Sequence, residues 1–219
     1  MTHIISLNIR IWTRDTKRQS EHWWVARYRA IHDYIKEQNP DVICLQEVWW
    51  PAKYVLRLGK LGYKKTGWGF SHPIFVRKSL RVREHRVSTY ATMAIVDEVQ
   101  YFSVHAHWDK DRFAKAMEWI RTKIYNFHRI ALYRVVAAGD FNTSDTKKVQ
   151  EALALKSARE QLGAERVDTF ANYKRPKQSH GEIDHFFTGC IHVPIIESYS
   201  VGPDDLSDHR PIVFSFQDK

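Results

Sequence analysis

The alternation of short apolar runs with a segment of helical periodicity constrains the fold most. The runs HIISLNI and DVICLQEV, at residues 3–9 and 41–48, are rich in β-branched residues, and each ends in polar residues where a strand would leave a sheet. Between them, apolar side chains recur with a period of about 3.6 residues, namely Trp24, Tyr28, Ile31 and Ile35. Ser20 is a candidate N-cap, and NPD at residues 39–41 ends the helix. The pattern predicts two strands joined by a helical crossover.

The rest of the chain continues this mixture of strands and helices. Residues 72–82 and 89–108 are predicted as consecutive strands with a turn at Asp97 and Glu98, which favours antiparallel pairing. A second helix is predicted at about residues 111–127, where one stripe is apolar: Phe113, Ala116, Met117, Ile120, Ile124 and Phe127. Residues 133–153 predict a strand, a polar loop and a helix that begins near Thr143, Ser144 or Asp145. GEIDHFF, IIESYSV and PIVFSF are the remaining strand candidates.

Size and cysteine content favour one ordinary globular domain. The chain has 219 residues, 43% of them hydrophobic, which suffices for one sizeable core, so we expect a single mixed α/β domain over residues 1–219. Cys44 and Cys190 lack metal-ligand spacing and are predicted to be thiols in a reducing compartment. No signal sequence is visible, nor an apolar run of about 18 residues. We therefore expect a soluble, cytoplasmic protein without stable membrane association, and we assume a monomer.

The net charge points to a polyanionic partner. A formal charge of +9 suits nucleic acid or an anionic membrane surface, although charge governs association and not fold. VLRLGKLGYKKTGW and YKRPK mix basic and aromatic residues, as nucleic-acid-binding segments do, but a solvated basic face with partly buried aromatics is an equal alternative. Trp49 and Trp50 follow Glu47 closely and are candidates to stack on a base or sugar of the substrate.

Polar residues gather at or just past the ends of the apolar runs: Asn8, Glu47, His107, Asp140, Asn142, Asp208 and His209. Each alone has an ordinary structural explanation as a turn former, a helix cap or a surface ion pair. Several of them in one order, at the ends of successive strands, favour a shared site instead.

The segments that carry these residues resemble the endonuclease/exonuclease/phosphatase superfamily, which has the deoxyribonuclease I-like fold. The resemblance rests on LNIR, DVICLQEV, HAHWD, AAGDFNT, EIDHFF and LSDHRPI, and it runs from residue 4 to residue 214. It implies an α/β four-layer sandwich of two stacked mixed, mainly antiparallel sheets flanked by helices. It also implies a phosphoesterase site that depends on a divalent metal ion.

The resemblance assigns the metal and catalytic roles. It makes Glu47 the principal ligand of Mg²⁺ or Mn²⁺, with Asn8 and Asp208 in the same metal site; oxygen ligands suit such hard cations. Asp140 would align or deprotonate the attacking water, and Asn142 would donate to a phosphate oxygen. His209 would act as a base or phosphate binder, with its tautomer fixed by Asp184, the acid of EIDHFF.

The same assignments make chemical sense. Hydrolysis adds an oxygen nucleophile to an anionic phosphorus centre, so the site must supply positive charge, an oriented water and help for the leaving oxygen. A carboxylate-bound cation, an acid/base and an imidazole supply these three functions.

The chain departs from the family pattern at two places. His105 stands where the family commonly has Asn, and because it shares a strand face with His107, either could be the family histidine. We prefer His107 as the catalytic histidine and assign His105 to substrate binding. Glu182 and His185 flank Asp184 where the family often has Arg and an aromatic or Arg, which leaves the substrate contacts near that strand open.

Three functions remain, and the first is preferred. The chain is predicted to be a metal-dependent nuclease that hydrolyses phosphodiester bonds of DNA or RNA. The alternative is a phosphatase or phosphodiesterase that acts on a small molecule or a lipid headgroup, since one fold can host both. A catalytically silent nucleic-acid-binding module is disfavoured, because it would not need every catalytic position to be occupied.

Overall fold

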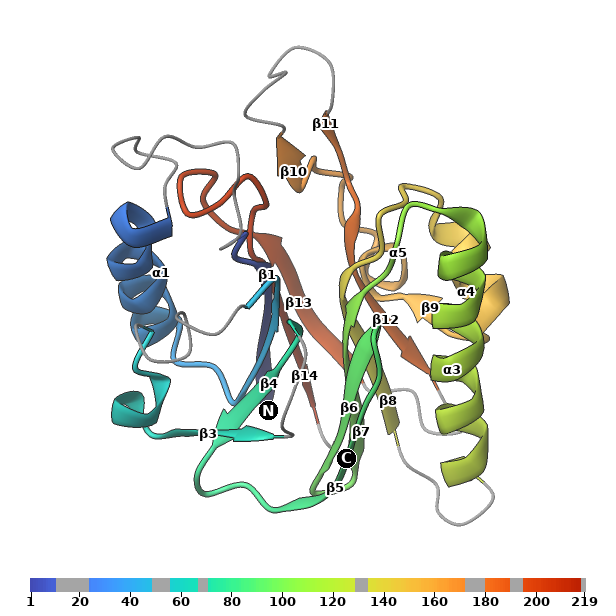
Figure 1. The fold of residues 1–219 in the computed structure, drawn as a ribbon, viewed down its shortest axis with the longest axis horizontal. Coiled ribbons are helices and arrows are strands. Elements are labelled where there is room, and N and C mark those ends of the chain that lie inside the picture. Colours follow the sequence, from blue (N-terminus) through green and yellow to red (C-terminus); the bar gives the residue numbers. More distant parts are fainter. Residues whose placement is uncertain are drawn as a thin grey trace.

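The computed structural model describes residues 1–10, 24–48, 56–66, 71–128, 134–171, 180–189 and 195–217. Two six-stranded sheets pack face to face, with helices on their outer faces (Figure 1). The helix α1 (Trp24–Gln38) covers the first sheet, while α3 (Lys110–His128) and α4 (Thr146–Leu153) cover the second. The expected α/β four-layer sandwich is confirmed.

The first sheet has the strand order β13-β14-β1-β2-β4-β3. The bounds of its strands are β1 (Thr2–Asn8), β2 (Val42–Gln46), β3 (Tyr63–Thr66), β4 (Ile74–Arg77), β13 (Ile195–Val201) and β14 (Ile212–Gln217). The strands β1 and β2 run parallel, as the predicted helical crossover through α1 requires, and the other neighbours are antiparallel.

The second sheet has the order β5-β6-β7-β8-β12-β9. The bounds of its strands are β5 (Val82–Val87), β6 (Ala91–Val96), β7 (Val99–His105), β8 (Arg134–Asp140), β9 (Lys156–Ser157) and β12 (Asp184–Gly189). The strands β7 and β8 are parallel and are joined through α3, while the others pair antiparallel. Each sheet therefore contains one parallel pair joined by a helix and is otherwise antiparallel.

Three apolar layers hold the sandwich together. The layer between the sheets includes Ile4, Val42, Cys44, Val136, Phe186 and Phe214. The layer under α1 includes Ile5, Ile31, Ile35, Ile43 and Leu45, and the layer under α3 and α4 includes Phe102, Phe113, Met117, Ile120, Phe141 and Val149. Because successive strand residues point to opposite faces, central strands such as β1 and β7 contribute side chains alternately to the layer between the sheets and to one outer layer.

Most predicted elements are present. The described apolar positions of α1 and α3 face the core as expected, and Asp145, one of three candidates, caps α4 by accepting a hydrogen bond from Lys148 N at 3.0 Å. Ser20 lies outside the described residues, as does Cys190. Cys44 is buried as a free thiol, and burial raises its pKa.

The short elements were not predicted. These are η1 (Leu58–Leu61), β3, β9, α5 (Ala158–Leu162), and the two-stranded ribbon of β10 (Phe170–Ala171) and β11 (His180–Gly181). Among the helices that the structure describes, none is both long and apolar enough to cross a membrane.

Candidate active site

Strand register brings polar residues from both sheets to one end of the sandwich. In the second sheet, Asp140 at the end of β8 pairs with His105 at the end of β7 and with Asp184 at the start of β12. In the first sheet, Asn8 ends β1, and Glu47 follows directly after β2. Because β1, β2, β7 and β8 all end here, residues far apart in sequence face one cleft.

Asn8 links the carboxylates of the two sheets. Its fully buried amide nitrogen donates to Glu47 Oε1 and to Asp140 Oδ2, both at 3.1 Å. Its amide oxygen accepts from the backbone N–H of Arg10 at 3.1 Å. The amide therefore presents nitrogen, and not oxygen, to the acids, so Asn8 positions two carboxylates in this arrangement.

Glu47 lies in a turn that directs its side chain across the end of the sheets. Its φ of +55° falls in the left-handed region, which is uncommon for a non-glycine residue. The side chain is 25% exposed, and among the described residues no Lys or Arg pairs with its carboxylate. Glu47 thus offers an unneutralised carboxylate to the cleft.

His209 and Asp184 form a hydrogen-bonded pair. His209 Nδ1 donates to Asp184 Oδ2 at 2.9 Å, which leaves Nε2 3.8 Å from Asp140 Oδ2. Burial alone would lower the pKa of His209, but the carboxylates of Asp184 and Asp140 outweigh burial and raise it to about 9. His209 is therefore an imidazolium at neutral pH, and it donates through Nε2 toward the cleft.

Asp140 is held from both sides. Its Oδ1 accepts from the backbone N–H of Asn142 at 2.8 Å, and the Asn142 amide donates to the Ala106 carbonyl at 2.8 Å. Asn142 adopts a φ of +50°, which turns the chain back toward β7. Burial raises the pKa of Asp140, and the nearby charge of His209 opposes this effect.

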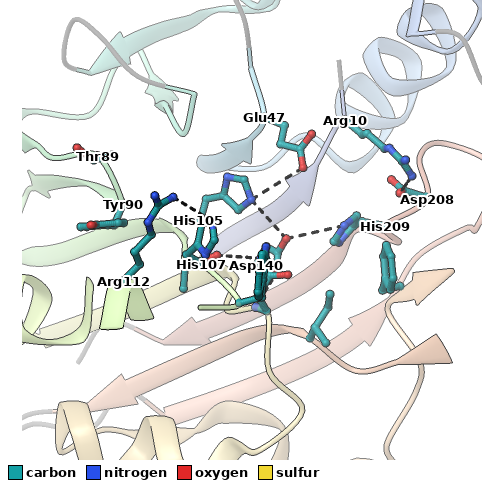
Figure 2. A pocket seen from close by; sticks show the side chains of 15 residues that line it. Arg10, Glu47, Thr89, Tyr90, His105, His107, Arg112, Asp140, Asp208 and His209 are labelled. Carbon is teal, nitrogen blue, oxygen red and sulfur yellow. Dashed lines mark hydrogen bonds and ion pairs between the residues drawn. The ribbon is translucent and has the colours of Figure 1, made fainter. Parts of the chain in front are cut away.

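His105 takes the central position among the two candidate histidines. Its Nε2 lies 3.9 Å from Glu47 Oε1 and 3.8 Å from Asp140 Oδ2, and Figure 2 shows the ring between these two acids. His107 lies beyond the end of β7, where its ring contacts Asp109 N and Arg112 on the rim. The geometry thus gives the central place to His105, whereas the sequence interpretation preferred His107.

Asp208 pairs with an arginine in the cleft and does not contact Glu47 or Asp140 in the interactions of the described residues. Its carboxylate forms an ion pair with Arg10 and accepts from Ser207 Oγ at 3.2 Å (Figure 2). Among the described residues, Arg10 thus neutralises the acid that was expected to be a metal ligand. Asp208 lies on the wall next to His209, while Glu47 and Asp140 meet at Asn8.

Two supporting features were missed in the sequence. Arg27, only 4% exposed, donates to the carbonyls of Ile9, Arg10 and Leu206 at 3.3, 3.1 and 2.6 Å, and so fastens the two segments that carry the Arg10–Asp208 pair. The available signal was its place four residues before Ile31 on the apolar stripe. Beneath the cleft, Gln46 donates to Ser6 and Ser103, and this buried polar contact joins the sheets.

The cleft has a volume of about 820 Å³. Its wall comprises Arg10, Glu47, Thr89, Tyr90, His105, Ala106, His107, Trp108, Arg112, Asp140, Asn142, Phe170, Ile183, Asp208 and His209. Trp108, at 77% exposure, is the prominent aromatic of the described rim, and it was not singled out in the sequence. Trp49 and Trp50, which were, lie outside the described residues, as does the loop YKRPK.

Glu182 and His185, on either side of Asp184, do not line the cleft. Glu182 is buried and pairs with Arg159 at 2.7 Å, and His185 Nε2 contacts the Thr143 carbonyl at 2.9 Å. Burial is the main cause that raises the pKa of Glu182 and lowers that of His185. Both side chains serve the packing beneath the second sheet.

Two groups of side chains have the donors for a metal ion. Ligand atoms of Asp140, Asp184 and His209 lie within 4.8 Å of one another. However, the Asp184–His209 hydrogen bond already occupies two of these three donors. The Glu47 carboxylate accepts a hydrogen bond from the neutral amide of Asn8, and no described Lys or Arg pairs with it. Glu47 with Asp140 is therefore the better match for a hard cation, which prefers carboxylate oxygens.

Known structures share this fold over nearly their whole length. An endonuclease/exonuclease/phosphatase from Bacteroides vulgatus aligns with 100% of this chain and 99% of its own, at 21% identity and a TM-score of 0.81. A Bacteroides thetaiotaomicron mannosyl-6-phosphatase aligns over 99% and 100%, at 17% identity and a TM-score of 0.79. D. rerio TDP2 complexed with a single-strand DNA product aligns over 99% of both chains, at 19% identity and a TM-score of 0.75.

The sequence itself gives the family. A search of curated proteins found no match. The sequence model of the Endonuclease/Exonuclease/phosphatase family, by contrast, matches residues 18–209, which span most of the chain. The matched segment includes all the acids and histidines that line the cleft, while Asn8 lies before it. The chain therefore belongs to the Endonuclease/Exonuclease/phosphatase family.

Proposed function

We propose that this protein is a divalent-metal-dependent phosphoesterase that hydrolyses phosphodiester bonds of nucleic acid. The observation that carries the proposal is the arrangement of charge in one cleft: the Glu47 and Asp140 carboxylates meet at Asn8, and the Asp184–His209 pair faces Asp140 from the other side. Hydrolysis of a phosphoester requires positive charge close to the phosphate, and acids that hold a cation next to a buried imidazolium would supply it.

Glu47 and Asp140 would hold the metal ion, Mg²⁺ or Mn²⁺. Asn8 would orient the two acids, since its amide nitrogen donates to both of them. When bound, the ion would supply positive charge against the charge that develops on the phosphate oxygens. Asp208 is assigned a different task, which is to hold Arg10 at the edge of the cleft where a phosphate oxygen can reach it.

The remaining side chains would position water and phosphate. Asp140 Oδ2, which lies 3.8 Å from both His105 Nε2 and His209 Nε2, would align the attacking water, while Oδ1 accepts from the backbone N–H of Asn142. His209, charged at neutral pH because its pKa is raised to about 9, would donate to a phosphate oxygen or to the leaving oxygen. His105, between Glu47 and Asp140, would contact the phosphate from the opposite side.

The surface favours nucleic acid over a small substrate. The formal charge is +9, and the rim of the cleft carries Arg10, Arg112 and the exposed Trp108. Cationic side chains neutralise phosphates, and exposed rings stack on bases. The alternative is a small phosphoester, because the fold is shared with a mannosyl-6-phosphatase as well as with a TDP2 that holds single-strand DNA product.

A substrate panel tests the proposal. The protein is incubated with Mg²⁺, Mn²⁺ or EDTA and with plasmid DNA, single-stranded DNA, an abasic-site duplex, RNA and p-nitrophenyl phosphoesters. We expect metal-dependent cleavage of a polynucleotide that EDTA abolishes, and a strongly reduced metal dependence in Glu47→Gln. Cleavage of the small phosphomonoester alone would favour the alternative function, and full activity in EDTA would contradict the metal mechanism.

A further inference from the structure

A histidine and an arginine face each other on the rim of the cleft beyond His105. His107 Nε2 lies 3.3 Å from Arg112 Nη1, and both side chains line the cleft. Figure 2 shows them on the side away from Arg10 and Asp208. A guanidinium group has N–H donors and no acceptor, so a hydrogen bond between the two side chains requires His107 Nε2 to accept.

The other ring nitrogen of His107 prevents this. Nδ1 lies 2.9 Å from the backbone nitrogen of Asp109, and a peptide N–H can only donate. Nδ1 therefore accepts, and the imidazole must carry its proton on Nε2. The result is two N–H donors, one from His107 and one from Arg112, that converge on the same space and cannot bond to each other.

Two convergent donors, one of them cationic, fit an anionic oxygen. Among the described residues, no carboxylate pairs with the Arg112 side chain, and Arg112 is exposed to the solvent of the cleft. An oxygen that accepted from both groups would satisfy His107 Nε2 and neutralise the guanidinium, and such charge-assisted bonds are among the stronger ones in proteins.

A flat aromatic surface lies beside this pair. Trp108 is 77% exposed, and its ring is 5.0 Å from that of His107 with an interplanar angle of 32°. The next residue, Asp109, caps α3 by accepting from Arg112 N at 3.1 Å, so the backbone of the rim is fixed. An exposed ring next to an anion-binding pair matches a base next to its phosphate.

The rim is also fixed relative to the reacting groups. Ala106, next to His107, donates through its N–H to the Asp140 carbonyl at 2.9 Å, and its own carbonyl accepts from the Asn142 amide at 2.8 Å. The residue next to His107 is therefore hydrogen-bonded directly to the loop that carries Asp140. The pair on the rim and the Asp140 carboxylate thus line one cleft at a fixed relative position, as two sites for one extended substrate must.

We propose that His107, Trp108 and Arg112 form a second subsite, which binds the phosphate adjacent to the hydrolysed one together with the base that this phosphate carries. The inference rests on the proposed function and narrows its substrate to nucleotide strands or strand ends with at least two neighbouring phosphates. It replaces the catalytic role that the sequence suggested for His107 with a role in substrate binding.

Matched substrates that differ by one phosphate test the subsite. Thymidine 5′-(p-nitrophenyl phosphate) is compared with its 3′-phosphorylated form, and thymidine 3′-(p-nitrophenyl phosphate) with its 5′-phosphorylated form. In one pair, we expect the extra phosphate to raise kcat/KM by about tenfold or more, the gain expected from a charge-assisted hydrogen bond. Arg112→Gln should bring this ratio close to one, whereas Arg121→Gln, on the same helix outside the cleft, should retain it. The proposal is overturned if the extra phosphate leaves kcat/KM of the unmodified protein nearly unchanged in both pairs. It is also overturned if Arg112→Gln does not reduce the gain from the extra phosphate.

Binding without turnover separates the subsite from the proposed function. In EDTA, the anisotropy of a fluorescein-labelled oligothymidylate should report weaker binding for Arg112→Gln and Trp108→Ala, and near-normal binding for Trp108→Phe, which keeps an aromatic ring. Loss of binding in these variants without hydrolysis of any probe would contradict the proposed function and support the subsite. Hydrolysis of all probes with unchanged binding would support the function and refute the subsite.

Discussion

The hydrogen bond between His209 and Asp184 decides which ring nitrogen faces the cleft. Because Nδ1 donates to Asp184, Nε2 remains directed toward Asp140. We expect His209→Ala to lower kcat by about 10²–10⁴-fold, the usual loss when a general acid/base is removed. Asp184→Asn should cost about 10–100-fold, as the loss of an orienting partner does. Steady-state hydrolysis of the substrate found in the panel measures both.

A structural role for the same residues makes the opposite prediction. If Asp208 and His209 served only to begin β14, His209→Ala would leave kcat intact and lower stability by about 1 kcal/mol, the typical value of a lost cap. His85→Ala, on the exposed face of β5, provides the matched control for loss of a histidine. Unchanged turnover in His209→Ala would therefore refute the catalytic assignment.

At the scale of residues, sequence patterns identified the polar positions but not their orientations. Glu47, Asp140, Asp184 and His209 were singled out because they end or begin apolar runs. Three of them line one cleft, and the buried Asp184 is hydrogen-bonded to His209. The order of His105 and His107 could not be predicted, because β7 ends at His105 and the alternation of the strand no longer governs His107. Nor does any sequence pattern reveal the left-handed turn at Glu47.

At the scale of elements, the contact between β7 and β8 depends on Gly139. Its φ is +144°, and a Cβ at this position would overlap the backbone of Val104 on β7. Gly139→Ala should therefore lower the free energy of unfolding by about 2 kcal/mol or more, because the strands must separate or strain. It should also reduce turnover, since Asp140 is the next residue. Chemical denaturation together with an activity assay measures both effects.

Gly59→Ala is the matched control for that substitution. A Cβ at Gly59 would meet nothing within 4 Å, so the free energy of unfolding of the Gly59→Ala variant should be close to that of the unmodified protein. If Gly139→Ala were as stable as the unmodified protein, the close approach of β7 and β8 would not be a requirement of the fold.

The stability of the link between the sheets at His72 should depend on pH. His72, in the segment before β4, contacts the Ser88 carbonyl at 3.0 Å in the turn between β5 and β6, and so links the two sheets. Burial lowers its pKa from 6.5 to about 4, although the Ser88 hydrogen bond opposes this. As the pH falls, His72 therefore takes up a proton in the unfolded chain before it does so in the folded protein. The contribution of neutral His72 to the free energy of unfolding is fully present above pH 6.5 and is lost as the pH falls toward 4.

The loss should amount to about 3 kcal/mol over that interval, since each pKa unit corresponds to about 1.4 kcal/mol. The measurement is urea denaturation at several pH values for the unmodified protein and for His72→Gln. The variant should begin less stable at neutral pH and show a shallower decline on acidification. Parallel declines would show that His72 does not cause the acid sensitivity.

Elements with strong periodicity could be predicted, and short ones could not. The stripes of α1 and α3 and the apolar runs of β1, β2, β7, β8 and β14 each contain enough repeats for the period to be recognised. The strand β3 lies in a basic segment, and β9, β10 and β11 contain two residues each, so tertiary contacts and not local sequence determine them.

At the scale of the molecule, topology explains why the site forms at all. Two parallel pairs, β1 with β2 and β7 with β8, each end at the same edge of their sheets, and the packing of the sheets places these edges together (Figure 1). Periodicity alone predicts the strands and crossovers but not which sheet a strand joins. The family resemblance supplied the stacking of the sheets, and through it the expectation that residues 8 to 209 share one cleft.

The net charge of the molecule governs its association with a polynucleotide, and this gives the last prediction. A protein with a formal charge of +9 that contacts phosphates releases counterions on binding, so its affinity should fall linearly with salt on logarithmic axes. For single strands the slope is about −0.7 per phosphate contacted. Anisotropy titrations of labelled single-stranded DNA in EDTA, between low and moderate KCl, measure this slope.

Because Arg112 is proposed to contact one phosphate, Arg112→Gln should make the slope shallower by about 0.7. Arg121→Gln removes the same charge outside the cleft and should change the slope less. Equal changes in the two variants would mean that only overall charge matters. Salt-independent binding, or no binding with undiminished hydrolysis of a small phosphoester, would assign the cleft to a small substrate instead.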